Sequence, residues 1–190
     1  METVDSRLRV RLSVGLLCFL LAVPLAGCAG QAGPTPVSVV DGGTAMPVDP
    51  AEVEKASRLA LAAYAGYLEA ARKASGVPDP MAPELRKYLA DPLLTKVRLG
   101  IRELDDKGAI RTGRLTSNPT VAEVDLVSNP KTVLIQDCID ATDYKMVYKK
   151  DKSKVPGPSS GRYVATATAS FYPKDGWLIY DGASYPDQPC

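Results

Sequence analysis

The stretch Thr132–Asp140, with the sequence TVLIQDCID, decides the fold because it predicts a strand lying inside a sheet. Side chains alternate between the two faces of a strand, so the odd-numbered residues of this stretch share one face and the even-numbered residues share the other. One of the two aspartates, Asp137 or Asp140, is thus expected to face the interior. Such a carboxylate is either a buried base or, more often, the cap of a turn, which here is Asp140-Ala141-Thr142-Asp143.

Further strands are predicted on both sides, because the chain after Gly108 is rich in β-branched and aromatic residues. Turn signals separate them at Asn118-Pro119, Asn129-Pro130, the Pro156–Gly161 loop and Lys174-Asp175-Gly176. This pattern is typical of an antiparallel meander. The expected strands are Ile110–Ser117, Thr120–Val127, Tyr144–Lys149, Arg162–Tyr172 and Trp177–Tyr185.

Helices are predicted before the strands. Asp49 is suited to be an N-cap, and Pro50 is suited to the first position of a helix. Alanines and tyrosines then recur at three- and four-residue steps, which predicts a helix that ends near Gly76. A second helical region is interrupted at Asp91-Pro92, so Pro92 is expected to start the third helix. We predict an α+β fold in which N-terminal helices pack on a curved, cone-like antiparallel sheet of about five or six strands, in one domain spanning residues 49–190.

The N-terminus has the three parts of an export signal. The positive end is supplied by three arginines, and the apolar stretch is Leu12–Val23. The cleavage site lies in Leu25-Ala26-Gly27-Cys28. An apolar stretch of about 12 residues is too short for a permanent transmembrane helix, which needs about 20. The segment Met1–Cys28 resembles the bacterial lipoprotein signal with its lipobox. This resemblance implies cleavage before Cys28 and a diacylglyceryl group on its thiol; an ordinary secretory signal is the alternative.

Processing divides the chain into a signal peptide at residues 1–27, a glycine- and proline-rich tether at 28–48, and the domain at 49–190. Acyl chains on Cys28 hold a protein stably on a bilayer. The expected location is therefore the extracytoplasmic face of the cell membrane, with the membrane as a partner through the lipid on Cys28.

Only two cysteines are left for pairing after processing, because Cys18 leaves with the signal and Cys28 carries the lipid. Cys138 and Cys190 then remain in an oxidising compartment, where a disulfide between them is expected. The bridge would close a loop of about 52 residues and stabilise the fold by about 4 kcal/mol on the chain-entropy model. A redox pair or two free thiols are the alternatives, although the chain contains no Cys-x-x-Cys.

The chain contains no histidine, which excludes Ser-His-Asp and Cys-His catalysis and every imidazole metal site. Its charges balance, with 23 Lys and Arg against 22 Asp and Glu. The densest basic run, Lys145–Lys154, is interrupted by Asp151 and is interpreted as a solvated loop. We therefore expect no nucleic-acid partner.

A second resemblance rests on the helical N-terminal half, the expected sheet, the Asp137-Cys138-Ile139-Asp140 segment and the late strand with Trp177. These features are similar to actinobacterial lipoproteins with a nuclear transport factor 2-like (cystatin-like α+β) domain. The resemblance implies a bent sheet around a long helix, a cone-shaped pocket, and dimerisation through the sheet face in many members. It implies a fold more than a function, and no catalytic residue is carried over with it.

Carboxylate chemistry is the enzymatic alternative that these residues leave open. Asp137 or Asp140 would act as the base in a water-poor pocket, and Tyr64 or Tyr144 would polarise a carbonyl. The acidic residues of this region lack the ligand spacing of a calcium loop, so neither a metal nor a cofactor is expected.

We expect a noncatalytic lipoprotein of the cell envelope that binds or scaffolds an envelope protein or a small apolar ligand. The alternative is a pocket enzyme of the isomerase or hydratase type, and a homodimer is a further possibility. The interior distinguishes these roles, because an enzyme needs a carboxylate at the wall of a pocket whereas a scaffold can have a filled core.

Overall fold

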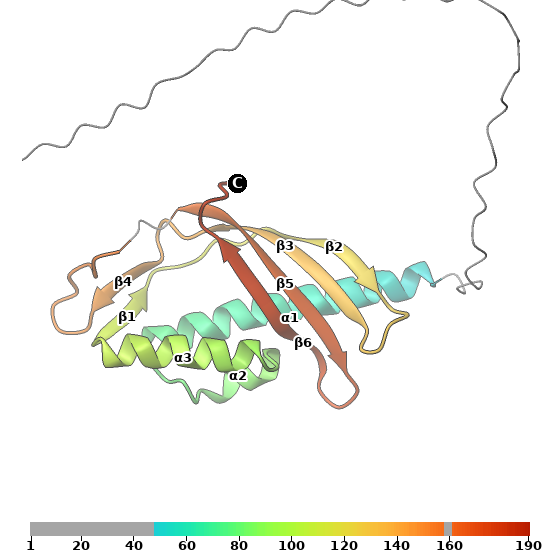
Figure 1. Cartoon of the computed structure of the whole chain (residues 1–190), viewed down its shortest axis with the longest axis horizontal. Coiled ribbons are helices and arrows are strands. Elements are labelled where there is room, and N and C mark those ends of the chain that lie inside the picture. The colour runs from blue at the N-terminus through green and yellow to red at the C-terminus, as the bar shows by residue number, and fades with distance from the viewer. Residues whose placement is uncertain (1–47, 158–160) are drawn as a thin grey trace, which may run out of the picture. The chain divides into compact units, whose positions relative to one another are not determined.

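The computed structural model describes residues 48–157 and 161–190. The predicted signal peptide (1–27), nearly all of the predicted tether and Cys28 lie outside the described residues. In the described part, three helices pack against two antiparallel sheets that do not close into a barrel (Figure 1). The predicted α+β class is confirmed.

Helix α1 (Pro50–Gly76) begins where the sequence predicts, because the Asp49 carboxylate accepts the backbone N–H of Ala51 at 2.9 Å. Its buried face consists mainly of alanines, which let the helix lie close to its neighbours. At Gly66 any Cβ would lie inside van der Waals contact with the ring of Tyr88, so glycine is required where α1 meets α2. None of the helices in the described ranges combines the length and apolar character needed to cross a membrane.

Helices α2 (Pro83–Tyr88) and α3 (Leu93–Asp106) follow, with Asp91-Pro92 between them as predicted. Both pack into the main core through leucines and an isoleucine. Leu89 forms a parallel bridge with Ile179, and the Ala90 N–H donates to the Ile179 carbonyl at 3.0 Å. These contacts fix the segment between α2 and α3 along the edge of the larger sheet.

The larger sheet has the strand order β2-β3-β5-β6, formed by Pro119–Asp125, Thr132–Asp140, Arg162–Tyr172 and Gly176–Tyr185. The smaller sheet pairs β1 (Ala109–Thr112) with β4 (Lys145–Tyr148). The predicted meander is therefore wrong at β1, which overlaps the expected strand Ile110–Ser117, and at β4, because these two strands form a sheet of their own. Because Asp140 pairs directly with Arg162, the chain between them leaves the sheet and pairs with β1 instead.

Strand β3 lies at the centre of the architecture, as its sequence predicts. Its odd-numbered residues from Val133 to Ile139 are buried beneath the sheet, where α1 covers them. Its even-numbered residues lie on the opposite face, where Cys138 forms a disulfide with Cys190 and the Cα atoms are 5.8 Å apart. The predicted disulfide is thus present and joins the last residue of the chain to the central strand.

Candidate functional site

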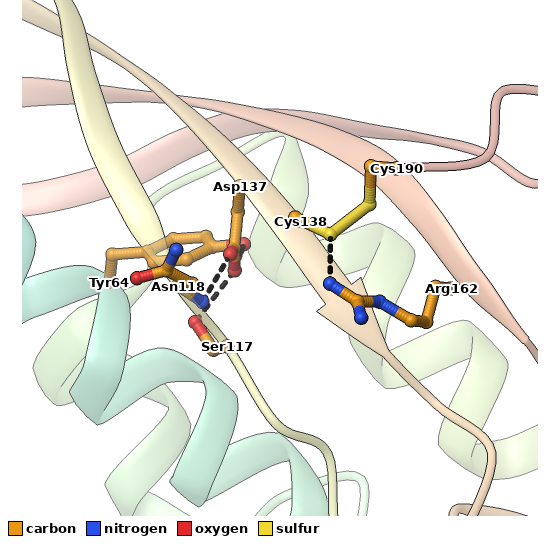
Figure 2. The surroundings of a disulfide bond; sticks show 7 residues. All are labelled: Tyr64, Ser117, Asn118, Asp137, Cys138, Arg162 and Cys190. Carbon is orange, nitrogen blue, oxygen red and sulfur yellow. Dashed lines mark hydrogen bonds between the residues drawn. A yellow bond between two sulfur atoms is a disulfide. The ribbon is translucent and has the colours of Figure 1, made fainter.

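Asp137 is the only aspartate or glutamate among the described residues that is buried, with 2% of its surface exposed. Its Oδ2 accepts hydrogen bonds from the Tyr64 hydroxyl at 3.0 Å and the Ser117 hydroxyl at 2.6 Å. Its Oδ1 accepts the backbone N–H of Asn118 at 2.7 Å (Figure 2). Both carboxylate oxygens are therefore engaged.

Asp137 and its hydrogen-bond donors lie on three separate segments of the chain. Asp137 lies on the inner face of β3, opposite Pro119 in the register of β2 and β3. Ser117 and Asn118 immediately precede β2, and Tyr64 comes from the buried face of α1. Figure 2 shows Asp137 pointing towards Tyr64 while its neighbour Cys138 points to the other face of the strand. The carboxylate therefore ties α1 and the start of β2 to the central strand.

This arrangement suits a structural role. A buried carboxylate is stable when hydrogen bonds replace its lost hydration, and three such bonds to a charged acceptor are individually strong. A general base needs an oxygen that faces the substrate. Asp137 lines neither of the two grooves described below. Its oxygens are occupied by donors from the fold.

Alkaline unfolding tests the protonation state of Tyr64. Burial, followed by the negative charge of Asp137, raises the pKa of Tyr64 above its ordinary value of 10.0. Below pH 10 this stabilisation is fully present. Above pH 10 the unfolded chain loses the phenol proton while the folded chain keeps it, so the free energy of unfolding falls by about 1.4 kcal/mol per pH unit for this group. Urea unfolding above pH 10 should show a shallower decline for Tyr64→Phe; equal slopes would contradict this expectation.

Asp140 and Tyr144, the other two predicted pocket residues, lie apart from this cluster. Asp140 Oδ1 accepts the backbone N–H of Thr142 at 2.9 Å, as expected for a turn cap, and hydrogen bonds from Thr142 lower the pKa of Asp140. Tyr144 is buried beneath Arg111, whose guanidinium carbon lies 5.2 Å from the ring centroid. Burial raises the pKa of Tyr144. The structure thus unites Tyr64 with Asp137 only.

A groove of about 390 Å³ lies between α1, α3 and the β1–β4 sheet. Its walls are mainly apolar, and its charged lining residues are three cations and one acid: Arg72, Lys107, Arg111 and Glu103. Arg72 is neutralised by Glu69, with two hydrogen bonds of 2.8 Å. The Arg72 hydrogen bonds lower the pKa of Glu69 to about 2.

A second and larger groove of about 650 Å³ lies between the β1–β4 sheet and the ends of β5 and β6. Arg111 and Tyr144 line both grooves, so the two hollows share a wall. The lining of the larger groove includes Lys145, Lys154, Arg162 and Tyr163 but no aspartate or glutamate. It is therefore a basic groove with aromatic side chains in its walls.

The sequence indicated some of these residues and missed others. Asp137, Tyr64 and the disulfide cysteines were proposed from strand alternation, composition and cysteine number. Ser117 and Asn118 were assigned only to a strand end and a turn, although a hydroxyl and a free N–H beside Pro119 are a weak signal of a side-chain acceptor. Arg111 and Arg162 have no local signal, because they line one groove only after distant strands have paired.

Comparisons with known proteins give a limited result. No protein-family model matches the chain, and no curated protein matches it. Among solved structures, the intermembrane-space region of the chloroplast protein ARC6 is similar, with 15% sequence identity and a TM-score of 0.42. The match covers 68% of this chain and 96% of that one.

Proposed function

We propose that this chain is a lipid-anchored lipoprotein on the extracytoplasmic face of the cell membrane, and that its α+β domain is a noncatalytic binding module. The lipobox at Leu25–Cys28 supports the anchor. The Cys138–Cys190 disulfide supports an oxidising compartment, because such bonds are rare in reducing cytosol. The long helix α1 against a four-stranded sheet supports the proposed nuclear transport factor 2-like class.

The observation that supports the noncatalytic role is that both carboxylate oxygens of Asp137 accept hydrogen bonds from the fold. The donors from Tyr64, Ser117 and Asn118 occupy both of its oxygens, so this buried carboxylate is used to hold the fold. The isomerase or hydratase alternative requires a carboxylate and a tyrosine facing one substrate cavity. Asp140 caps a turn and Tyr144 stacks under Arg111. Among the described residues, no carboxylate lines the larger groove, and the one that lines the smaller groove, Glu103, lies 3.8 Å from the Nζ of Lys107 and forms an ion pair with it.

Detergent partition of the expressed protein tests the anchor. Wild-type protein made in a lipoprotein-processing bacterium should enter the detergent-rich phase of a cloud-point separation, because two or more acyl chains hold a protein stably in a bilayer or micelle. Cys28→Ala should lose the lipid and move to the aqueous phase once the signal is removed. Cys18→Ala is the matched control and should behave as wild type. Partition of mature Cys28→Ala into detergent would contradict a lipid on this thiol.

A further inference from the structure

The β1–β4 sheet and its flanking segments form a strongly basic lobe, defined here as residues 107–116, 142–157, 161 and 162. The lobe carries nine cations and two anions, a net charge of +7. Residues 49–190 as a whole carry 20 cations and 19 anions, so the remainder of the domain has a net charge of −6. Lys107 pairs with Glu103 and Lys149 pairs with Asp105, two acids just outside the lobe, so the excess positive charge rests mainly on the other seven cations. The cations of the lobe are Lys107, Arg111, Arg114, Lys145, Lys149, Lys150, Lys152, Lys154 and Arg162.

The larger groove opens within this lobe, and its charges are of one sign. Arg111, Lys145, Lys154 and Arg162 line it, and none of these four has a carboxylate within 4.0 Å among the described residues. The nearby acids Asp140 and Asp143 do not line the groove. Asp140 lies opposite Arg162 in the register of β3 and β5, and its pKa is lowered by hydrogen bonds from Thr142 and in part by the charge of Arg162. The four cations outnumber these two acids, so the hollow has a positive potential that concentrates anions.

The walls of the groove add a second chemical feature. Tyr163 is half-buried, and Pro156 and Pro186 present flat apolar surfaces beside the cations. Aromatic and proline faces suit the apolar face of a sugar ring, while lysine and arginine suit acidic substituents on that ring. The volume of about 650 Å³ lies within the range of about 300–1,000 Å³ that ligand sites occupy.

We propose that this groove binds an acidic glycan, a sugar chain that carries anionic groups, outside the anchoring membrane. The inference rests on the proposed binding role and names its ligand class. The lobe lies far from the start of α1 within the domain (Figure 1). Val48, where the described chain begins, lies at one end of α1, and the β1–β4 sheet lies at the other (Figure 1). The 27 residues of α1 separate these ends by about 40 Å.

Binding of a defined acidic glycan to the full-length processed protein in neutral detergent tests the inference. The probe is an oligogalacturonide, measured by calorimetry, and its fully methyl-esterified form is the uncharged counterpart. Lys145→Glu combined with Lys154→Glu should lower the affinity by about 100-fold, and Arg162→Gln alone by about tenfold. The matched control, Lys55→Glu with Lys174→Glu, has the same change of net charge outside the lobe and should lower affinity by less than about threefold.

Support requires that the acidic oligosaccharide binds, that its ester does not, and that poly-L-glutamate binds more weakly. Equal binding of the polypeptide would show a charge effect without sugar recognition and would overturn the inference. No binding of the oligogalacturonide, binding only to phosphatidylglycerol vesicles, or equal losses in the lobe and control variants would also overturn it. The detergent-partition result for Cys28 is independent of these outcomes, so the anchor and the ligand class fail separately.

Discussion

Replacement of Asp137 by alanine is expected to lower the free energy of unfolding by about 3–5 kcal/mol, because it leaves three buried or half-buried donors without their acceptor. Those donors are the Tyr64 hydroxyl, the Ser117 hydroxyl and the Asn118 N–H. A typical domain is stable by only about 5–15 kcal/mol, so the variant should be close to unfolding at physiological temperature. Guanidinium unfolding followed by circular dichroism measures the change.

Asp140→Asn is the matched control for that experiment. Asp140 lies three residues away on the same strand, and its carboxylate makes a local bond to Thr142 at the end of the strand. Its substitution should cost less than about 1 kcal/mol, since the asparagine oxygen can still cap the turn. If the Asp137 and Asp140 variants were equally stable, the carboxylate of Asp137 would not be holding the fold, and the enzymatic alternative would regain weight.

Loss of the Cys138–Cys190 disulfide is the second change with a large expected effect. The bridge spans a sequence separation of 52 residues, and the chain-entropy model gives about 4 kcal/mol of stabilisation for a loop of this size. Replacing both cysteines by alanine should therefore reduce the unfolding free energy by about that amount. The cost arises mainly in the unfolded chain, because the bridge restricts the conformations that this chain explores.

A reductant provides an independent check of the disulfide prediction. Wild-type protein unfolded in dithiothreitol should approach the stability of the Cys138→Ala, Cys190→Ala variant, while the variant itself should show no response to the reductant. A variant as stable as oxidised wild type would mean that the native state is strained by the bridge or that the unfolded state is already compact.

Local sequence signals predicted the elements of this fold well. Strands β3 and β5 have the predicted bounds, because alternating apolar residues and adjacent turns mark both ends. The Asp49-Pro50 cap placed the start of α1 for a similar reason. The departure of β4 from the sheet was not predicted, since pairing between distant strands depends on which contacts bury the most surface and leaves no local pattern.

The candidate sites show the same division between local and distant information. Strand alternation brought attention to Asp137, but its partners come from α1 and from the segment before β2. The sequence predicts a strand over Tyr144–Lys149 and a solvated basic run over Lys145–Lys154. It does not predict that β4 pairs with the strand that carries Arg111. Arg162 lies on a third segment, at the start of β5. The basic groove therefore exists only in the folded chain.

A double-mutant cycle between Tyr64 and Asp137 tests most directly whether the buried carboxylate stabilises the folded state through its hydrogen bond with Tyr64. Unfolding free energies would be measured for wild type, Tyr64→Phe, Asp137→Ala and the double variant. The account predicts a coupling energy of about 1.5 kcal/mol or more, because the hydroxyl donates to a buried charged acceptor at 3.0 Å. Additive effects, with a coupling below about 0.5 kcal/mol, would show that this bond does not hold α1 to the central strand and would contradict the structural role of Asp137.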